Sequence, residues 1–371
     1  MNNKMFKFKN ILIPISFIFF LISCQKEFLS VPDSNRINFF VRNSPIQIVE
    51  TRSTLIDNSE QFAAKSFGVF GYCVPYAQKT DPNANYAEDF SGAKSVWEAK
   101  KGLSIPDIFN NQEISYTNDT KSWEYSNARP WESRNGNVST TIINPADYKY
   151  TFIAYYPYQS TVSSSSPWTI TTNIGAPTLT YTIPIETINI GSKTYLDDSE
   201  IQDVMYAYTF DHLRSWGSVP LTFKHIMTGV NVKLVSYEDN STIHINSIEL
   251  NGTFRKVYKH NFSNNEITYD GSHSYPYYLG STTLVKTSSI YESDTVLLLC
   301  EDKLGENVEF VIDYDVDNQD RSPAHLPIPD NLTIVPGTVY TFTVSFINNT
   351  VYLQLQTDRW DHGGDSVSTI K

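Results

Sequence analysis

Short stretches in which apolar and polar residues alternate recur along this chain, and such alternation is typical of half-buried β-strands. Glycine, proline and asparagine separate many of these stretches, as they do at turns. One apolar stripe over residues 93–103 predicts a short helix, and no long amphipathic helix is expected. The predicted strands cover residues 37–41, 67–74, 150–157, 179–183, 204–207, 221–225, 230–234, 243–250, 296–300, 308–316, 339–346 and 351–355. The pattern favours an all-β fold of antiparallel β-sandwiches.

A stretch near the middle of the chain, residues 219–234, interrupts its own alternation. Leu221 and Phe223 fall on the apolar side of one strand, and the phase then slips before alternation resumes at Val230. A slipped phase beside a glycine is typical of a bulge or corner. We therefore expect this stretch to form the seam between two sandwiches, with Gly229 turning the chain.

The length of 371 residues exceeds what one ordinary core holds, so two domains are expected. The predicted N-terminal sandwich covers residues 65–216 and the C-terminal sandwich residues 217–371. The net charge of −12, with no basic patch between aromatic residues, excludes a nucleic-acid partner. Cys73 and Cys300 lie in apolar stretches of opposite halves, which favours two separate buried thiols over a disulfide framework.

Residues 1–23 have the organisation of a bacterial signal peptide. Lysines precede an apolar run over residues 11–22, which is shorter than the roughly 20 residues that span a bilayer. The run ends in Leu21-Ile22-Ser23-Cys24, which resembles the lipobox of lipoproteins. In that motif the cysteine thiol receives a diacylglycerol before the signal peptide is cut. We therefore expect lipid on Cys24 and anchoring to the cell outer membrane.

Residues 24–64 form the expected lipidated leader. Gln25-Lys26-Glu27 resembles the surface-export signal of Bacteroidetes-type lipoproteins, which favours surface exposure. Residues 37–41 are the candidate first strand, and residues 43–64, which contain Arg52, have little periodicity and are expected to be an exposed link.

No motif of enzyme chemistry is present in the chain. The sequence has no Gly-x-Ser-x-Gly elbow, phosphate-binding glycine loop or Cys-x-x-Cys pair, so we expect no enzyme and no cofactor. The seven histidines are scattered, which argues against zinc. Asp313, Asp315 and Asp317 imitate the start of a calcium loop, but Ala324 stands where a bidentate glutamate is required. No metal site is predicted.

Tryptophans in the loop-rich first half leave a second interpretation open. Exposed Trp97 and Trp131 could stack on sugar rings, whereas packing in a core is the commoner role of tryptophan in such sandwiches. The alternative function is therefore a glycan-binding lipoprotein of the outer membrane on a β-sandwich scaffold.

Several segments, in their order along the chain, resemble the fimbrillin (Mfa-like) family. They are Arg52 in its Thr-Arg-Ser link, the Phe67-Gly-Val-Phe-Gly-Tyr72 strand, Phe152-Ile-Ala-Tyr-Tyr-Pro157, Ile201-Gln-Asp-Val-Met-Tyr-Ala207, Leu221-Thr-Phe-Lys-His225, the Pro336-Gly-Thr-Val-Tyr340 strand entry and Trp360. The resemblance runs from about residue 52 to residue 360. It implies tandem transthyretin-like β-sandwiches in a subunit of type V pili.

The same resemblance implies how such a subunit assembles. A protease cuts after an arginine behind the first strand, and a strand of the next pilus subunit replaces the one that is lost. Arg52 matches the processing arginine, and Arg42 is a second candidate. Ile37, Phe39 and Val41 would then be the strand-exchange residues. Both arginines could instead be ordinary link residues, because anchor subunits of these pili remain uncut and lipidated.

The end of the chain bears on the role within a pilus. Only residues 361–371, with little apolar alternation, follow Trp360, which departs from the donor strand expected of a stalk subunit. A tip, accessory or anchor role, with adhesion to host or bacterial surface ligands and location in a fimbria or on the outer membrane, is the expectation.

Overall fold

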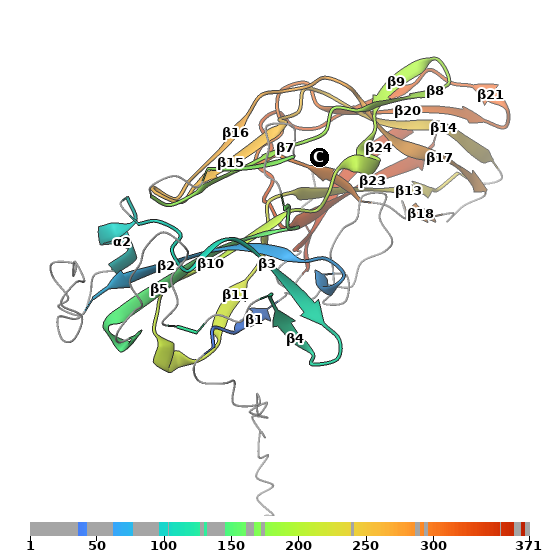
Figure 1. The fold of residues 1–371 in the computed structure, drawn as a ribbon. Coiled ribbons are helices and arrows are strands. Elements are labelled where there is room, and N and C mark those ends of the chain that lie inside the picture. The colour runs from blue at the N-terminus through green and yellow to red at the C-terminus, as the bar shows by residue number, and fades with distance from the viewer. Residues whose placement is uncertain are drawn as a thin grey trace, which may run out of the picture.

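The computed structural model describes residues 36–42, 62–76, 96–102, 104–126, 130–131, 145–160, 167–171, 175–238, 241–285, 290–292, 296–348, 350–359 and 365–367. Most of these residues lie in strands, which are arranged in packed sheets (Figure 1). The predicted all-β sandwich class is confirmed.

The N-terminal strands form one eight-stranded sheet, which is the first group. Its strands follow the order β11-β1-β4-β3-β2-β5-β10-β12. The sheet curls back on itself, so that β10 and β11 meet, and the Thr209 hydroxyl of β10 donates a hydrogen bond to the Pro220 carbonyl of β11. The strands are β1 (Phe39–Arg42), β2 (Phe67–Pro75), β3 (Phe109–Thr117), β4 (Ser122–Glu124), β5 (Tyr148–Tyr156), β10 (Met205–His212), β11 (Val219–Thr222) and β12 (Lys224–His225).

A second group of strands packs as two facing sheets around a separate part of the core. One sheet runs β18-β13-β23-β24-β25, with β19 also on β13, and the other runs β17-β14-β20-β21, with β22 on β20. The strands are β13 (Thr228–Ser236), β14 (Thr242–Asn251), β17 (Tyr277–Val285), β18 (Ile290–Glu292), β19 (Leu297–Leu299), β20 (Glu309–Val316), β21 (Gln319–Asp320), β22 (Ala324–Pro327), β23 (Thr338–Ile347), β24 (Thr350–Arg359) and β25 (Asp365–Val367).

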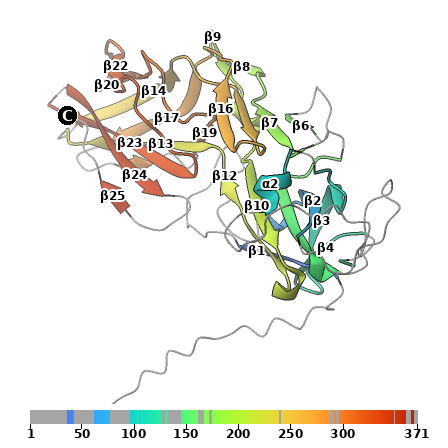
Figure 2. The same cartoon turned by 90° about the vertical axis from the view of Figure 1, so that its left-hand side faces the viewer.

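A further sheet joins segments from both halves of the chain. β7 (Thr178–Thr182) pairs with β15 (Val257–Asn261), and β6 (Trp168–Thr171) and β16 (Glu266–Asp270) extend the sheet on either side. Figure 2 shows this sheet beside the second group and above the first. A two-stranded hairpin, β8 (Thr187–Ile190) with β9 (Lys193–Leu196), precedes β10.

The predicted boundary between residues 216 and 217 does not follow the strand pairing. β11 and β12 lie after it, yet they pair with β1 and β10 of the first group. β6 and β7 lie before it, yet they share a sheet with β15. By strand pairing, the chain passes from the first group of strands to the second at residues 226–227, between the end of β12 and the start of β13.

The stretch over residues 219–234 contributes to both core clusters. Leu221 and Phe223 lie in the core of the first group, and Val230 lies in the core of the second. The role predicted for Gly229 is wrong, because Gly229 lies inside β13 and does not turn the chain. A Cβ atom there would come 2.8 Å from Val296 Cγ1, so this position needs glycine for close packing.

Two pairings in the sheets are parallel, although the alternation predicted antiparallel strands. β1 runs parallel to β11, and β13 runs parallel to β23. Each pair is separated by a long stretch of chain, which is the condition that parallel pairing requires.

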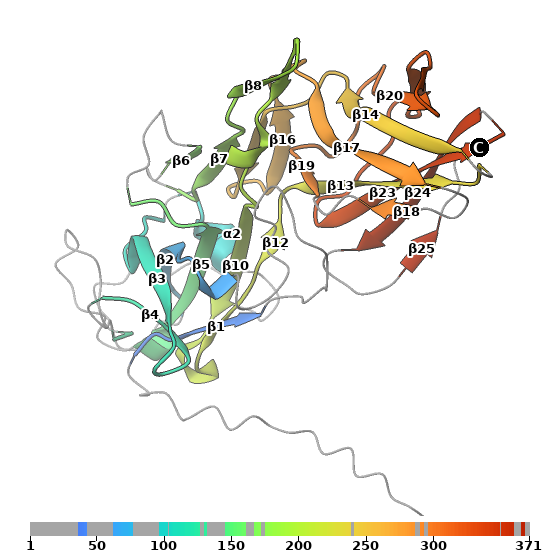
Figure 3. The same ribbon diagram turned by 90° about the vertical axis from the view of Figure 1, so that its right-hand side faces the viewer.

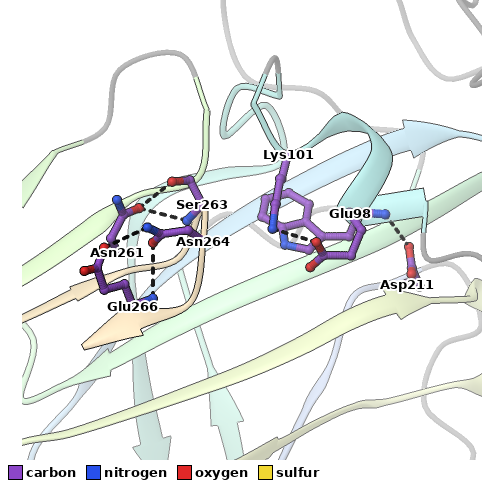
Figure 4. Close-up of polar contacts among 8 residues, drawn as sticks. Glu98, Lys101, Asp211, Asn261, Ser263, Asn264 and Glu266 are labelled. Atoms are coloured by element: carbon purple, nitrogen blue, oxygen red, sulfur yellow. Dashed lines mark hydrogen bonds and ion pairs between the residues drawn. The ribbon is translucent and has the colours of Figure 1, made fainter.

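The predicted short helix is α2 (Val96–Lys100). Asp211 of β10 accepts a hydrogen bond from the Trp97 amide at 2.9 Å, and Lys101 pairs with Glu98 at 2.6 Å (Figure 4). Figure 4 also shows the β15–β16 turn, in which the Asn261 carboxamide oxygen accepts hydrogen bonds from the Ser263 amide and hydroxyl. Within the described ranges, no helix is long and apolar enough to cross a membrane.

Candidate functional site: the first strand and its groove

The first strand is an interior strand of its sheet. β1 lies between β11, with which it pairs in parallel from Phe39 opposite Val219 to Arg42 opposite Thr222, and β4, where Phe39 is opposite Trp123. Figure 3 shows β1 at the lower edge of the first group, on the far side from β14 and β17. A strand in this position is held by ladder hydrogen bonds and by whatever side chains it buries.

Phe39 anchors β1 in the core. Its side chain is 7% exposed, and its ring contacts four other aromatic rings. The centroid distances run from 5.6 Å to Phe152 to 6.4 Å to Tyr125, with Phe109 and Phe67 between them. Edge-to-face contacts of this kind add to the free energy of burial.

Ile37 is the second anchor. Its side chain is fully buried, and its carbonyl oxygen accepts a hydrogen bond of 3.0 Å from the Tyr125 hydroxyl. The guanidinium of Arg36 lies 5.5 Å from the centre of the same tyrosine ring. Val41 is partly buried and packs against the same core. The three predicted strand-exchange residues thus share one face of the chain, directed into the first core.

The side chains around Phe39 line a groove that another strand could fill. Without β1, the apolar faces of Phe67, Phe109 and Phe152 would be open to solvent, together with an edge of β11 and of β4. Each large side chain withdrawn from such a core costs about 2 kcal/mol. An open sheet edge above an apolar floor pairs readily with an extended segment of another chain.

Pro220 faces away from β1. The Val219 amide donates to the Asn38 carbonyl at 2.8 Å, so Val219 faces β1 and the next residue of the strand faces the other way. On that other side the Pro220 carbonyl oxygen accepts a hydrogen bond from the Thr209 hydroxyl of β10. The missing amide hydrogen of Pro220 therefore removes no hydrogen bond between β11 and β1.

The predicted site residues outside β1 lie at different places. Cys24 and Arg52 fall outside the described residues. Arg42 is the last residue of β1, at the point where the chain leaves the sheet. The prediction that residues 43–64 are all exposed is wrong at Phe62, which is fully buried and stacks on Tyr156 with a centroid distance of 4.4 Å.

Trp97 and Trp131 are buried, at 0% and 2% exposure. Trp97 packs against Tyr72 and Phe210, and Trp131 packs against Tyr150. Neither indole has a face open to a sugar ring in this structure, because other aromatic rings cover it. The expectation of glycan stacking at these two positions is therefore corrected to a role in packing.

The other sequence features have structural roles. Cys73 and Cys300 are buried in different clusters with no disulfide between them, as predicted. His225 is 8% exposed, and its Nδ1 atom lies 2.9 Å from the buried Asp203 carboxylate. Asp315 accepts a hydrogen bond from the Asn318 amide, which closes the β20–β21 turn. Across the described part of the chain, no group of three or more side chains is arranged to hold a metal ion.

Sequence reasoning missed the residues that form the walls of the groove. Phe109 and Tyr125 lie outside every strand predicted from the sequence, because β3 has too few apolar residues to alternate clearly. The recurrence of aromatic residues between 109 and 125 is the signal that could have found them.

Comparison with known proteins places this arrangement in a family. The model of the fimbrillin-like family matches residues 90–360, and the chain belongs to that family. A fimbrial protein from Bacteroides vulgatus has a similar fold, with a TM-score of 0.63 and 20% identity over 88% of this chain and 99% of that protein. A proposed cell adhesion protein from Bacteroides ovatus matches 88% of this chain and 97% of its own, with a TM-score of 0.46 and 15% identity. Among curated proteins there is no match.

Proposed function

We propose that this protein is a cell-surface fimbrillin-like lipoprotein that joins other pilus subunits by exchange of β1. The observation that carries the proposal is the insertion into the first core of Phe39, from an interior strand, and of Ile37, which lies just before that strand. A segment attached in this way can be replaced by a strand of another chain with the same alternation of apolar residues.

Cleavage behind β1 would make the exchange irreversible. Arg52 lies between the end of β1 and Phe62, so a cut there releases β1 from the rest of the chain. A cut after Arg42 would have the same effect. In both cases β1 would remain attached to Cys24 and its lipid, while the remainder of the protein could leave the membrane or polymerise.

Limited trypsin digestion of the folded protein tests the proposal. We expect a new N-terminus at Ser53 or Asn43, together with oligomers on size-exclusion chromatography that are absent before digestion. Arg52→Ala and Arg42→Ala, alone and together, identify the site, and a matched exposed cation of the second group, Arg321→Ala, serves as the control. No cut near either arginine, or a cut without oligomers, contradicts exchange by processing.

The role of Cys24 has its own test. We infer lipidation at this cysteine, with the protein held on the outer membrane before any processing. Labelling of cells with a radioactive fatty acid should mark the wild-type protein and leave Cys24→Ala unlabelled. If both are labelled, or neither is, the lipoprotein assignment is wrong.

A further inference from the structure

One large apolar side chain stands out at the surface of the first group of sheets. Trp216 is 63% exposed, more than any other large hydrophobic side chain in the described ranges. Isolated exposed apolar residues are common on soluble proteins, so exposure alone indicates little. The contacts that hold Trp216, its place in the fold and the charged residues around it are more informative.

The indole of Trp216 is held in place by the fold. Trp216 ends the 3₁₀ turn η3 (Arg214–Trp216), where its amide donates to the Leu213 carbonyl at 2.9 Å. Its ring meets the His212 imidazole edge to face at 5.5 Å, and that imidazole is buried and stacks on Trp131. His212 Nε2 also lies 3.0 Å from the Gly217 carbonyl oxygen. The exposed ring therefore stands on a rigid support and costs little conformational entropy to bind.

The register of β1 places Trp216 at one particular end of the molecule. β1 and β11 are parallel, with Phe39 opposite Val219, and the Val219 amide donates to the Asn38 carbonyl. Residues that precede Val219 must therefore lie beside residues that precede Phe39. Trp216 is consequently at the end of the sandwich from which the chain runs back to Cys24.

The distance from this end to the lipidated cysteine is limited by covalent geometry. Twelve residue steps separate Cys24 from Arg36, and a fully extended chain of that length spans about 40 Å. A lipid on Cys24 would thus hold this end of the protein within that distance of the bilayer, in any orientation of the leader.

The described residues place three cations at this end. Arg36, Lys149 and Arg214 are all half-buried, with the Lys149 ammonium 5.4 Å from the centre of the Tyr76 ring. Of the acidic residues described here, Asp107 is 7% exposed and Asp147 is 4% exposed. Glu124 is half-buried and its charge acts on Arg36, so Lys149 and Arg214 carry most of the attraction to an anionic surface. The whole chain, in contrast, has a net charge of −12.

We propose that this end, which we call the base surface (Arg36, Lys149, Arg214 and Trp216), docks on the bilayer that holds Cys24. Indole rings prefer the boundary between headgroups and acyl chains, and cations close by are attracted to lipid phosphates. The base surface supplies the second contact that complements the lipid and fixes the direction of the protein, with the β13–β24 group pointing away from the membrane. The proposal rests on the lipidation inferred above.

Fluorescence quenching in proteoliposomes tests the proposal. The lipidated full-length protein is reconstituted into phosphatidylcholine–phosphatidylglycerol vesicles with and without brominated acyl chains, which quench tryptophans in contact with them. We expect quenching of the wild-type protein, loss of most of that quenching in Trp216→Phe, and weaker quenching when Arg214→Ser and Lys149→Ser are combined. Tyr352→Trp in the Trp216→Phe background is the matched control, because position 352 is exposed in the second group and should not be quenched.

The outcomes separate the possible failures. Equal quenching of the wild-type protein and Trp216→Phe, or absence of quenching in protein that floats with the vesicles, overturns docking of the base surface. If Trp216→Phe changes the size of protein assemblies and not the quenching, the base surface is a contact between proteins and the proposal is wrong. Failure of the wild-type protein to float at all would reject lipidation at Cys24, and with it both proposals.

Discussion

Truncation of Phe39 is the perturbation that most clearly measures how β1 is attached. In Phe39→Ala the strand keeps its backbone and its pairing with β11, but it loses the ring that contacts Phe67, Phe109, Tyr125 and Phe152. The loss leaves a cavity in the centre of the groove.

The size of the effect follows from the burial of this ring. Phe39 is 7% exposed, and truncation of a buried phenylalanine to alanine costs about 3–5 kcal/mol. For a domain of about 150–250 residues, each kcal/mol lowers the melting temperature by about 2–4 °C, so a decrease of about 10 °C is expected. Phe40, the next residue on the opposite face of β1, is only half-buried, and Phe40→Ala should cost about 1 kcal/mol.

Thermal and urea unfolding of the two variants, followed by circular dichroism, measures this difference. Residues 1–23 are removed and Cys24→Ser replaces the lipidated thiol, so that lipid does not contribute. Equal destabilisation by Phe39→Ala and Phe40→Ala would refute the reasoning, because β1 would then be held by its backbone and not by its buried face. If the two variants differ in stability by less than expected, and trypsin cuts Phe39→Ala more rapidly than the wild-type protein, β1 already leaves the groove in the intact protein.

Three further predictions concern other parts of the fold. Burial raises the pKa of Glu301 from 4.5 to about 7, so the folded state holds the proton more tightly than the unfolded state. The free energy of unfolding should therefore fall by up to about 3 kcal/mol as the pH rises from 4.5 to 7. Urea unfolding of Glu301→Gln should lack this decrease. Gly229→Ala should destabilise by about 1–3 kcal/mol, because the new Cβ would meet Val296 and Val339 at 2.8 and 2.9 Å; combination with Val339→Ala should recover part of the loss in the same assay. Trp97→Ala should lower the melting temperature, at a cost of about 3–5 kcal/mol, and leave binding on a glycan array unchanged; a folded Trp97→Ala that loses sugar binding contradicts the packing role.

The strands with dense apolar alternation could be predicted from sequence. Residues 150–157 and 243–250 became β5 and β14, and residues 339–346 became β23, each within a few residues. In these segments each buried position is occupied by an apolar side chain, so local patterning and tertiary burial agree.

Strands with polar faces could not be predicted. β8 is largely exposed and β16 is exposed or half-buried, so neither buries enough side chains to alternate. β3, with Asn110, Asn111 and Gln112 near its start, lies outside every strand predicted from the sequence. The pairing of β3 with β2 gives it strand structure in spite of its composition, which is a tertiary effect.

Long-range pairing was the other part that sequence did not provide. The parallel pairing of β1 with β11 joins residues about 180 apart, and alternation contains no information about which strand is the neighbour. For the candidate site, the sequence identified Ile37, Phe39 and Val41, but the aromatic floor beneath them depends on that pairing. For the same reason, the expected boundary between residues 216 and 217 contains no information on the pairing of β11 and β12 with β1 and β10.

The most direct test of strand exchange is a reversible lock between β1 and β11. Phe40 and Pro220 are register partners, and adjacent strands lie about 4.8 Å apart, which suits a disulfide between Phe40→Cys and Pro220→Cys. The measurement is the size distribution, by chromatography, of the trypsin-cut double variant before and after reduction. We expect monomers while the disulfide is intact and oligomers after reduction. Oligomers in the locked form, or monomers after reduction when the cut wild-type protein forms oligomers, would contradict exchange of β1 as the means of assembly.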